Sequence, residues 1–592
     1  MQSPSLPNLP ALFFERASRG GDSPLFYTKT PSLAKGQKGQ WQAWSWNQIA
    51  SDARALSASL RDAGVAAGDR VAIVSENRPE WAIADIAIMM IGAIAVSVYT
   101  THSPADHQHV FSNSGAAVAI VSTTALAAQV MAGVKDGELQ HLFLIDDGDL
   151  GRWQDRAVTI HRWREAAAGT VPRFAEREWH QQAVTLMAAI PPDSLAQITY
   201  SSGTGGAPRG IMLSHRNIMS NIVAAEALIR PVILRDWFRP VPRVFLSFLP
   251  LSHSYEHTAG LWLPILLSAE VYYAESAAAL PANLQEVRPT IMTLVPRLFE
   301  MLYGRISNEV EKAPPLKRWL FHKTLATSRA KYQRQQSWSD WLLDPVLGLL
   351  VRRRVRQKFG GRIRALVSGG AALSTELAEY FHGLGVPVCQ GYGQTETAPV
   401  VACNSPIAPR LHTVGRPLAG VTVRIAEDGE ILVQGDNVMV GYWNDPEATA
   451  GSLVNGWLHT GDIGLVDEDG YLIITDRKRD IIKLSGGDTL SPARIEGRLG
   501  LEPEIHQAMV FASKSSGAFV VALIVTASPR VTEEAIRQAI ERANRDLTQP
   551  ERIRKFAIAR EAFTIENGLM TPTLKLRRHL ISREYEQEIA KL

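Results

Sequence analysis

The sequence predicts an α/β protein in which helices cover both faces of parallel sheets. In its first third, short apolar runs alternate with longer helical stretches, and a glycine-rich loop follows a later apolar run. Strands separated by helical stretches of about 10 to 20 residues are typical of doubly wound layers. Because such folds bind ligands beyond the carboxyl ends of their strands, the glycine-rich loop is the expected ligand site.

The individual elements are predicted from the spacing of apolar residues. The chain suggests an amphipathic helix at 46–63, strands at 70–75, 94–98 and 118–122, and a buried helix at 81–91. Further on it suggests strands at 196–200, 244–250 and 362–367, and a helix that begins near 214.

The longest apolar run, 81–99, is long enough to be considered as a membrane span. Asp85 lies within it and would cost roughly 2.5–3.5 kcal/mol at the bilayer centre, and Gly92 divides it. A buried helix followed by a strand therefore explains it better. The N-terminus lacks the cationic start and apolar core of a secretory signal, so we expect a cytoplasmic protein.

Length and composition narrow the class of protein. A chain of 592 residues exceeds one ordinary core and should form at least two domains. It is 46% hydrophobic and 20% charged, as in ordinary globular proteins. A net charge of +3 gives no case for nucleic-acid binding. The two cysteines, Cys389 and Cys403, suggest buried thiols in a reducing compartment.

The glycine-rich loop spans residues 200–210 and has the sequence YSSGTGGAPRG. Its glycines let the backbone approach a ligand closely, and successive N–H groups with Ser and Thr hydroxyls can cradle phosphate oxygens. Arg209 adds a bidentate phosphate donor. The spacing matches neither the Walker A motif nor the dinucleotide GxGxxG motif. A flexible surface loop is the alternative.

Other segments also suit nucleotide chemistry. Residues 390–397, QGYGQTET, combine an aromatic ring that could stack on a base, two glycines, and a carboxylate that could hold Mg²⁺ beside substrate phosphates. Asp462 follows an apolar run and could accept both hydroxyls of a ribose, with turn capping as the alternative. His253 and His257 lack further ligands at zinc-like spacing, so a metal site there is not expected.

The loop at 200–210 resembles the signature of the AMP-forming adenylating enzymes, which include acyl-CoA synthetases, peptide-synthetase adenylation domains and luciferases. It differs from their usual pattern by Ser201 for Thr, Gly205 for the second Thr and Arg209 for Lys. The other motifs follow in the family's order from about residue 46 to 578. The resemblance implies a large N-terminal domain, 1–476, built of doubly wound sheets, and a small mobile α+β C-terminal domain, 477–592.

Residue roles are carried over from the family motif by motif. The catalytic residues would be Lys575, Thr204, Arg209 and Glu396, of which Glu396 and Thr204 would hold Mg²⁺. ATP and AMP would be bound by Ser201, Ser202, Gly203, Gly205, Gly206, Gly369, Gly370, Ala371, Gly391, Tyr392, Gly393, Thr395, Asp462 and Arg477. Within this set Tyr392 would stack on adenine, Thr395 would contact the α-phosphate and Asp462 would bind the ribose.

The remaining roles concern the hinge and the other two substrates. Arg479 would lie at the hinge, and Gly486 and Gly487 would let CoA approach the backbone. His253 would line the acyl pocket, and His257 would stand near the position of an aromatic gate. The resemblance thus implies a long-chain fatty-acid–CoA ligase that uses ATP, Mg²⁺ and coenzyme A. The alternatives are a fatty acyl-AMP ligase that delivers to a carrier protein, and an idle relative that serves as a binding or scaffold protein.

The segment 301–364 differs from the rest of the chain. It has 15 Lys and Arg residues against 4 Asp and Glu, together with Trp319, Trp338 and Trp341. Basic amphipathic helices with aromatic residues lie on anionic membranes in many proteins. The segment therefore predicts either peripheral contact with the inner face of the membrane or a solvated helical hairpin. Such an insertion is more typical of long-chain acyl-CoA synthetases than of short-chain ones, and no oligomer is assigned.

Overall fold

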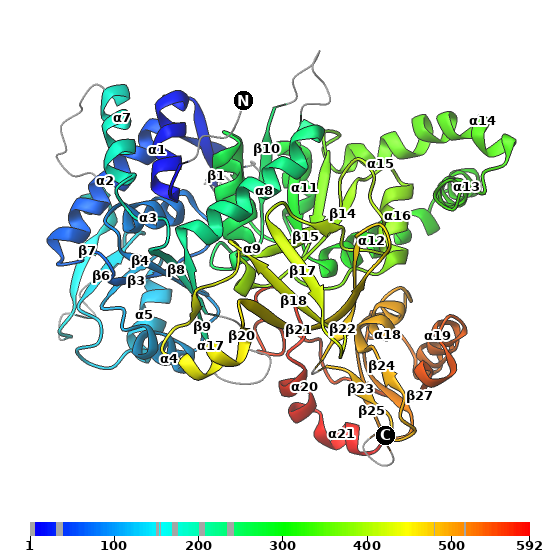
Figure 1. Ribbon diagram of the computed structural model, residues 1–592. Coiled ribbons are helices and arrows are strands. Elements are labelled where there is room, and N and C mark those ends of the chain that lie inside the picture. Colours follow the sequence, from blue (N-terminus) through cyan, green and yellow to red (C-terminus); the bar gives the residue numbers. More distant parts are fainter. Residues whose placement is uncertain are drawn as a thin grey trace.

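The computed structural model describes residues 6–30, 39–149, 153, 156–167, 176–200, 208–233, 242–478, 480–513 and 517–592. Two large sheets, a smaller third sheet and a separate C-terminal α+β unit make up the fold (Figure 1). The doubly wound α/β class expected from the sequence is confirmed, because most neighbouring strands of both large sheets are parallel and helices connect them.

The first large sheet has eight strands in the order β19-β9-β8-β4-β3-β5-β6-β7. Their bounds are β3 Arg70–Val74, β4 Ile94–Val98, β5 Val118–Val121, β6 His141–Leu144, β7 Thr159–Arg162, β8 Leu195–Tyr200, β9 Gly210–Ser214 and β19 Gly441–Tyr442. The strands from β8 to β7 run parallel, while β9 and β19 are antiparallel to their neighbours. The glycine-rich loop joins β8 to β9, so it leaves the carboxyl end of a central strand.

The second large sheet has nine strands in the order β16-β15-β14-β13-β12-β10-β11-β1-β2. Their bounds are β1 Pro24–Thr30, β2 Gln40–Ser45, β10 Val244–Ser247, β11 Glu270–Tyr273, β12 Ile291–Leu294, β13 Ala365–Ser368, β14 Val388–Gly393, β15 Val400–Cys403 and β16 Arg416–Pro417. The six strands from β14 to β1 are parallel, so the segments after β13 and β14 lie at one edge of this sheet.

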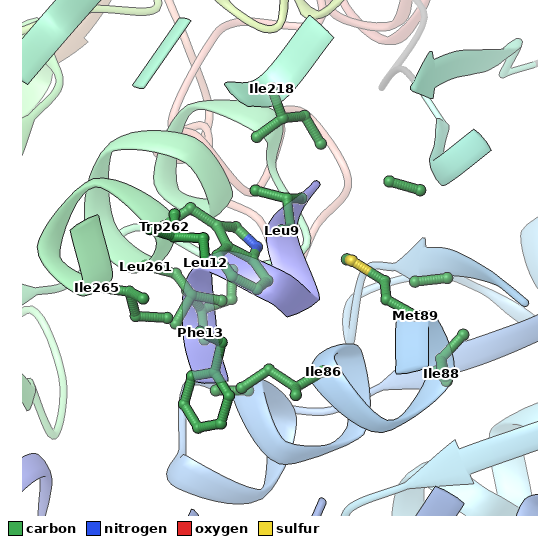
Figure 2. Close-up of a cluster of buried hydrophobic side chains, with 14 of the residues drawn as sticks. Leu9, Leu12, Phe13, Ile86, Ile88, Met89, Ile218, Leu261, Trp262 and Ile265 are labelled. Carbon is green, nitrogen blue, oxygen red and sulfur yellow. The ribbon is translucent and has the colours of Figure 1, made fainter. Parts of the chain in front are cut away.

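Helices from distant parts of the chain form the core between the two large sheets. They are α1 Leu9–Gly20, α3 Pro79–Met90, α8 His215–Ile233, the π-helical η2 His257–Trp262 and α10 Leu263–Leu266. Figure 2 shows Phe13, Ile86 and Trp262 from three of them packed in one buried cluster. That cluster also contains strand residues of both sheets, such as Ile73 and Val271. The nearly all-apolar composition of α3, in which only Glu80 and Asp85 are charged, is explained by burial on almost every side.

Local signals account for several element ends. Helix α2, Trp46–Asp62, begins at a capping box in which Ser45 and Gln48 bond each other's backbone N–H groups. The observed bounds lie within a few residues of most expected ones, although the strand expected at 362–367 runs from Ala365 to Ser368. Within the described residues, no helix is long and apolar enough to cross a membrane, as expected for the run that became α3 and β4.

The third sheet and the C-terminal unit complete the chain. The third sheet is antiparallel and contains β17 Val421–Ile425, β18 Glu430–Gly435, β20 Leu453–Val454, β21 Trp457–Val466 and β22 Leu472–Arg477. The C-terminal unit contains β23 Ile482–Lys483, β24 Thr489–Leu490, α18 Pro492–Leu499, β25 Ile505–Ala512, β26 Val520–Thr526, α19 Glu533–Arg545, β27 Ile553–Ile558, α20 Arg578–Glu584 and α21 Glu586–Ala590. In Figure 1 this unit lies below the nine-stranded sheet.

The basic segment is helical throughout most of its length. Its elements are α12 Pro296–Glu311, α13 Pro315–Tyr332, α14 Trp338–Leu347, the π-helical turn η3 Gly348–Arg352 and α15 Arg353–Lys358. Helices α13 and α14 extend from the main body at the right-hand edge of Figure 1.

Candidate active site

A cavity of about 1570 Å³ lies between the N-terminal sheets and the C-terminal unit. Its lining includes Arg209 of the glycine-rich loop, residues that follow β13, residues in and after β14, and Asp462 and Arg477 of the third sheet. Lys575 of the C-terminal unit lines the same cavity. Residues separated by more than 360 positions in the chain therefore meet at one place. Ser201, Ser202, Gly203, Thr204, Gly205, Gly206 and Arg479 lie outside the described residues.

Arg209 is connected to Glu396 through an aromatic side chain that the sequence did not indicate. The guanidinium carbon of Arg209 lies 5.4 Å from the ring centroid of Tyr442, a cation–π distance. The Tyr442 hydroxyl donates a hydrogen bond of 3.0 Å to Glu396 Oε1. Arg209 is also 3.4 Å from Asp445 in a half-exposed ion pair. The two-residue strand β19 pairs with β9 and so places Tyr442 beside Ile211, close to the end of the glycine-rich loop.

The surroundings of Glu396 fit a magnesium ion held beside substrate phosphates. Its Oε1 accepts from Tyr442, while its Oε2 accepts no hydrogen bond from any described residue. Among the described residues, no group of three or more His, Cys, Asp or Glu side chains could hold a metal ion by itself. Mg²⁺ is commonly held by one or two carboxylates, substrate phosphates and water, so a single carboxylate is an adequate protein ligand.

A second polar chain joins Tyr392, Asp462 and Arg477. The Tyr392 hydroxyl donates to Asp462 Oδ2 at 2.8 Å, and Arg477 Nε donates to Asp462 Oδ1 at 2.8 Å. Burial, followed by the neighbouring Asp462 carboxylate, raises the pKa of Tyr392 well above its usual value. Adjacent pairing of β21 with β22 puts Asp462 opposite Arg477. The carboxylate is thus held in one orientation on the cavity wall.

At the two glycine-containing turns, a side chain would collide with other parts of the protein. A Cβ atom on Gly369 would stand 2.9 Å from the ring of Tyr255, whose hydroxyl donates to the Val367 carbonyl at 3.0 Å. A Cβ atom on Gly393 would collide with the Pro399 carbonyl oxygen at 1.8 Å. Gly391, Ala371 and Gly370 line the cavity as well.

Thr395 lies in the same wall. Its Oγ1 accepts a hydrogen bond of 3.0 Å from Ser254, which begins the short helix α9, Ser254–Glu256. This bond fixes the threonine where the segment 390–397 faces the cavity. The hydroxyl is therefore held in a defined position in the cavity wall.

Lys575 reaches the cavity from a tight turn. Its N–H donates to Thr571 Oγ1 at 3.0 Å, its carbonyl accepts from the Thr571 N–H at 2.8 Å, and Leu574 has a left-handed φ of 60°. Lys575 Cε lies 3.8 Å from the position that a Cβ atom would take on Gly370. Burial, and then the Arg477 charge, lower the pKa of Lys575 to about 8, opposed by Asp462 and Glu396. The ammonium is thus close to groups from the large domain.

His253 lines the cavity, as the sequence predicts, and its Nδ1 accepts from the Tyr255 N–H at 3.1 Å. Burial, with a smaller effect of Lys575, lowers the pKa of His253 to about 3, so its ring is neutral at physiological pH. An apolar part of the cavity lies against α8 and the nine-stranded sheet. Its lining includes Ala225, Leu228, Ile229, Phe245, Ala259, Leu263 and Ile291.

His257 does not line this cavity, although the sequence analysis placed it near a gate. Its side chain is fully buried, with Nε2 2.9 Å from Asp85 Oδ2, and Trp262 Nε1 lies 3.1 Å from the same oxygen. The first turn of η2 points it toward α3, while Ala259 and Leu263 face the cavity. The geometry favours a structural role for His257 in place of the gate.

We expect His257→Ala to lower the midpoint of thermal unfolding without changing the order of preference among acids of different chain length. The substitution leaves the Asp85 carboxylate buried without its histidine partner, at a cost on the order of 3 kcal/mol. Differential scanning fluorimetry and a chain-length series measure the two effects. His253→Ala is the matched control, with reduced activity and little loss of stability. If the variant changed the chain-length preference without a change in stability, His257 would be assigned to the gate after all.

Gly486 and Gly487 lie in the exposed hairpin between β23 and β24 and do not line the cavity. Gly487 has a φ of 92°, which favours glycine.

Sequence reasoning missed Tyr442 and Tyr255. Neither belongs to a spacing pattern, and each acquires its role only from strand pairing or from a neighbouring turn.

The fold and this site define an adenylate-forming class of protein. The chain belongs to the AMP-binding enzyme family, whose model matches residues 13–443, and the model of the AMP-binding enzyme C-terminal domain matches residues 479–592. Its relatives include a long-chain-fatty-acid–CoA ligase, FadD15, of Mycobacterium tuberculosis, which is 32% identical over 93% of this chain and 92% of its own. Long-chain-fatty-acid–CoA ligase 5 of Mus musculus is 28% identical, over 95% and 86% respectively.

Solved structures share the fold at lower identity. The adenylation domain of a carboxylate reductase from Mycobacterium chelonae has a TM-score of 0.75 and 20% identity, covering 99% of this chain and 91% of that one. The O-succinylbenzoate coenzyme A synthetase of Bacillus subtilis, solved with AMP, has a TM-score of 0.67 and 20% identity, covering 96% and 97%. Both comparisons support the two-part α/β architecture.

Proposed function

We propose that this protein is an AMP-forming ligase that activates a long-chain fatty acid with ATP and transfers the acyl group to coenzyme A. The observation that carries the proposal is the meeting of Lys575, Glu396 and Asp462 at one cavity that also has an apolar part. A cavity with charged groups at one place and aliphatic side chains at another suits an acid with a polar head and a long chain.

In the first half-reaction, the fatty carboxylate attacks the α-phosphorus of ATP to give acyl-AMP and pyrophosphate. Lys575 neutralises the charge that builds between carboxylate and α-phosphate, as a compact cation. Glu396 and Thr204 would hold Mg²⁺, which neutralises phosphate charge when bound. Arg209 and the backbone of the loop 201–206 would bind the β- and γ-phosphates. Catalysis in this step is mainly positioning and charge stabilisation.

We assign the nucleoside to the part of the cavity that Tyr392, Asp462 and Arg477 line. Asp462, oriented by Tyr392 and Arg477, would accept the ribose hydroxyls. The adenine would lie against the Tyr392 ring and the turns at 369–371 and 391–393, where glycines permit close approach. The apolar side chains of α8, β10 and η2 would surround the acyl chain, with His253 at its entrance.

In the second half-reaction, the small domain would rotate about Arg479, so that the residues after this position move. This motion withdraws Lys575 and brings the exposed hairpin with Gly486 and Gly487 to the cavity, where the CoA thiolate attacks the acyl carbonyl and AMP leaves. Closure and opening of domains are common steps in catalysis. The exposed position of the hairpin in this structure is what such a motion requires.

We also propose that the enzyme works in the cytoplasm and meets its substrate at the inner face of the membrane. Both cysteines are unpaired and buried, as expected in a reducing compartment. Long-chain acids partition into bilayers, so an enzyme that takes them from lipid benefits from contact with it.

The test is to measure pyrophosphate release and thioester formation with acids from octanoate to oleate. We expect pyrophosphate release that depends on the added acid and thioester formation that depends on CoA. The highest kcat/KM is expected with the long acids. Thioester formation on a phosphopantetheinyl carrier protein but not on CoA would replace this proposal with a carrier-loading ligase. Absence of pyrophosphate release with all acids would make the protein a non-catalytic relative.

A further inference from the structure

Helix α14 and the turn η3 turn their apolar side toward solvent. Trp338 is 79% exposed and Trp341 is 69% exposed. Four further side chains share this exposure at helical spacing, and with the two tryptophans they form what we call the α14 stripe: Trp338, Trp341, Leu342, Val346, Leu349 and Leu350. Residues three and four positions apart lie on one face of a helix, so the stripe is a continuous apolar surface.

The opposite side of the same helix faces the protein and contains two acids beside the buried Leu347. Asp340 accepts from Lys323 at 2.9 Å, and Asp344 accepts from Lys331 at 3.0 Å, so both acids are tied to α13. Arg352 donates to Asp344 and to the Gly383 carbonyl, which anchors η3 to α16, Thr375–Gly383. A surface helix of a soluble protein normally buries its apolar side. Here most of the apolar side chains of α14 face solvent, and ion pairs hold the helix in this orientation.

Positive charge accompanies the stripe. Arg353 and Arg354 follow three and four residues after Leu350, and Lys312, Lys317 and Arg334 lie in or just outside α13, the helix that packs against α14. All five are exposed, and none forms an ion pair with a described residue. The exposed acids nearby, Glu309 and Glu311, already contact Lys358 and Arg318. The cationic side chains around the stripe are therefore available to an external anion.

The apolar stripe and the cationic side chains around it together favour one kind of binding partner. Tryptophan, leucine and flanking arginine are the residues that settle at the boundary between lipid headgroups and acyl chains. A second copy of the chain, docked stripe to stripe, would bring together two segments that each carry 15 Lys and Arg residues against 4 Asp and Glu, and like charges oppose such an interface. We propose that the α14 stripe is the part of this protein that inserts into an anionic lipid surface, with Arg353 and Arg354 at the headgroups.

The test compares vesicle binding of the full-length protein and of Trp338→Gln/Trp341→Gln/Leu349→Gln. Wild type should co-sediment with vesicles of phosphatidylcholine and phosphatidylglycerol at low salt. The triple variant should lose about tenfold or more in partitioning, because it removes most of the apolar surface that enters the lipid. The matched control, Leu186→Gln/Ile407→Gln/Leu465→Gln, changes three exposed apolar side chains elsewhere and should bind like wild type.

The charge of the surface is tested separately with Arg353→Gln/Arg354→Gln, which should bind more weakly and with less dependence on salt. Arg352 is left intact because it holds η3 in place. Wild type that stays in the supernatant with anionic vesicles overturns the proposal. So does a stripe-dependent dimer in sedimentation velocity without vesicles, which would assign the stripe to a second copy. Pyrophosphate release with albumin-bound acid should be unchanged in the triple variant, which separates this proposal from the ligase function.

Discussion

Replacing Lys575 with alanine is expected to lower the rate of acyl-AMP formation by roughly a hundredfold or more, because one preorganised cation at the reacting phosphate is lost. The same variant should convert supplied acyl-AMP and CoA to the thioester at close to the wild-type rate. Lys575 lies in the cavity in this structure but belongs to the domain that would rotate away before the second step. Single-turnover measurements of each half-reaction separate the two effects.

Lys591→Ala serves as the control, since Lys591 is an exposed lysine of the same C-terminal unit. It should leave both half-reactions unchanged. An equal loss in both half-reactions by Lys575→Ala would show that the lysine supports the fold of the small domain. Retained adenylation would remove it from the catalytic set.

The same lysine should set a limit on the alkaline side of the pH profile. Burial lowers its pKa to about 8, so the protonated form, which carries the needed charge, is lost as pH rises through that value. The kcat/KM for adenylation should then fall above about pH 8, as it reports ionisation in the free enzyme. Lys575→Arg stays charged and should move this decline to higher pH. A wild-type profile that is flat to pH 10 would contradict the role of the ammonium.

Replacing Glu396 with glutamine is expected to reduce adenylation by roughly a hundredfold, and to raise the concentration of Mg²⁺ needed for half-maximal pyrophosphate release. The amide is similar in size and can still accept from Tyr442, but it binds a hard cation far more weakly than a carboxylate does. Fatty-acid binding should change little, since the apolar part of the cavity lies against α8. A magnesium titration of the pyrophosphate burst measures the effect.

Tyr442→Phe is the matched control for Glu396→Gln. It removes the 3.0 Å hydrogen bond to Glu396 but keeps the carboxylate and the ring beneath Arg209. A modest loss with an unaltered Mg²⁺ requirement is expected. If both variants showed the same Mg²⁺ requirement as wild type, Glu396 would have a structural role in orienting Tyr442 and no role at the metal.

The secondary structure of the first third follows from local sequence because each element carries a strong local signal. The strand at 94–98 is apolar except for Ser97 and fully buried, and the helix at 46–62 has both amphipathic spacing and a capping box. The apolar run that includes α3 could be separated from a membrane span only through Asp85 and Gly92. The partner that makes Asp85 tolerable, His257, lies 172 positions away, and no local pattern reveals it.

The site also contains residues that a motif predicts and residues that only the structure reveals. Motifs located Arg209, Glu396, Asp462 and Lys575, and the structure brings all four to one cavity. The contact that joins the first two depends on Tyr442, whose position comes from a two-residue strand paired with β9. The basic segment could be predicted as amphipathic helices, but which side faces solvent is set by ion pairs from α13 to α14. Such contacts between helices are not encoded in either helix alone.

The bond between Arg477 and Asp462 has a consequence for how an intermediate is retained. Both residues precede position 479, as does Tyr392. The three side chains that would bind the nucleoside therefore belong to the part of the enzyme that does not rotate. Lys575 follows that position and would move. The acyl-adenylate, a hydrolysis-prone mixed anhydride, would then keep the same hold on its AMP portion throughout the turnover. The rate at which the acyl-adenylate dissociates from the enzyme should depend on Asp462 and Arg477. It should not depend on how often the small domain rotates.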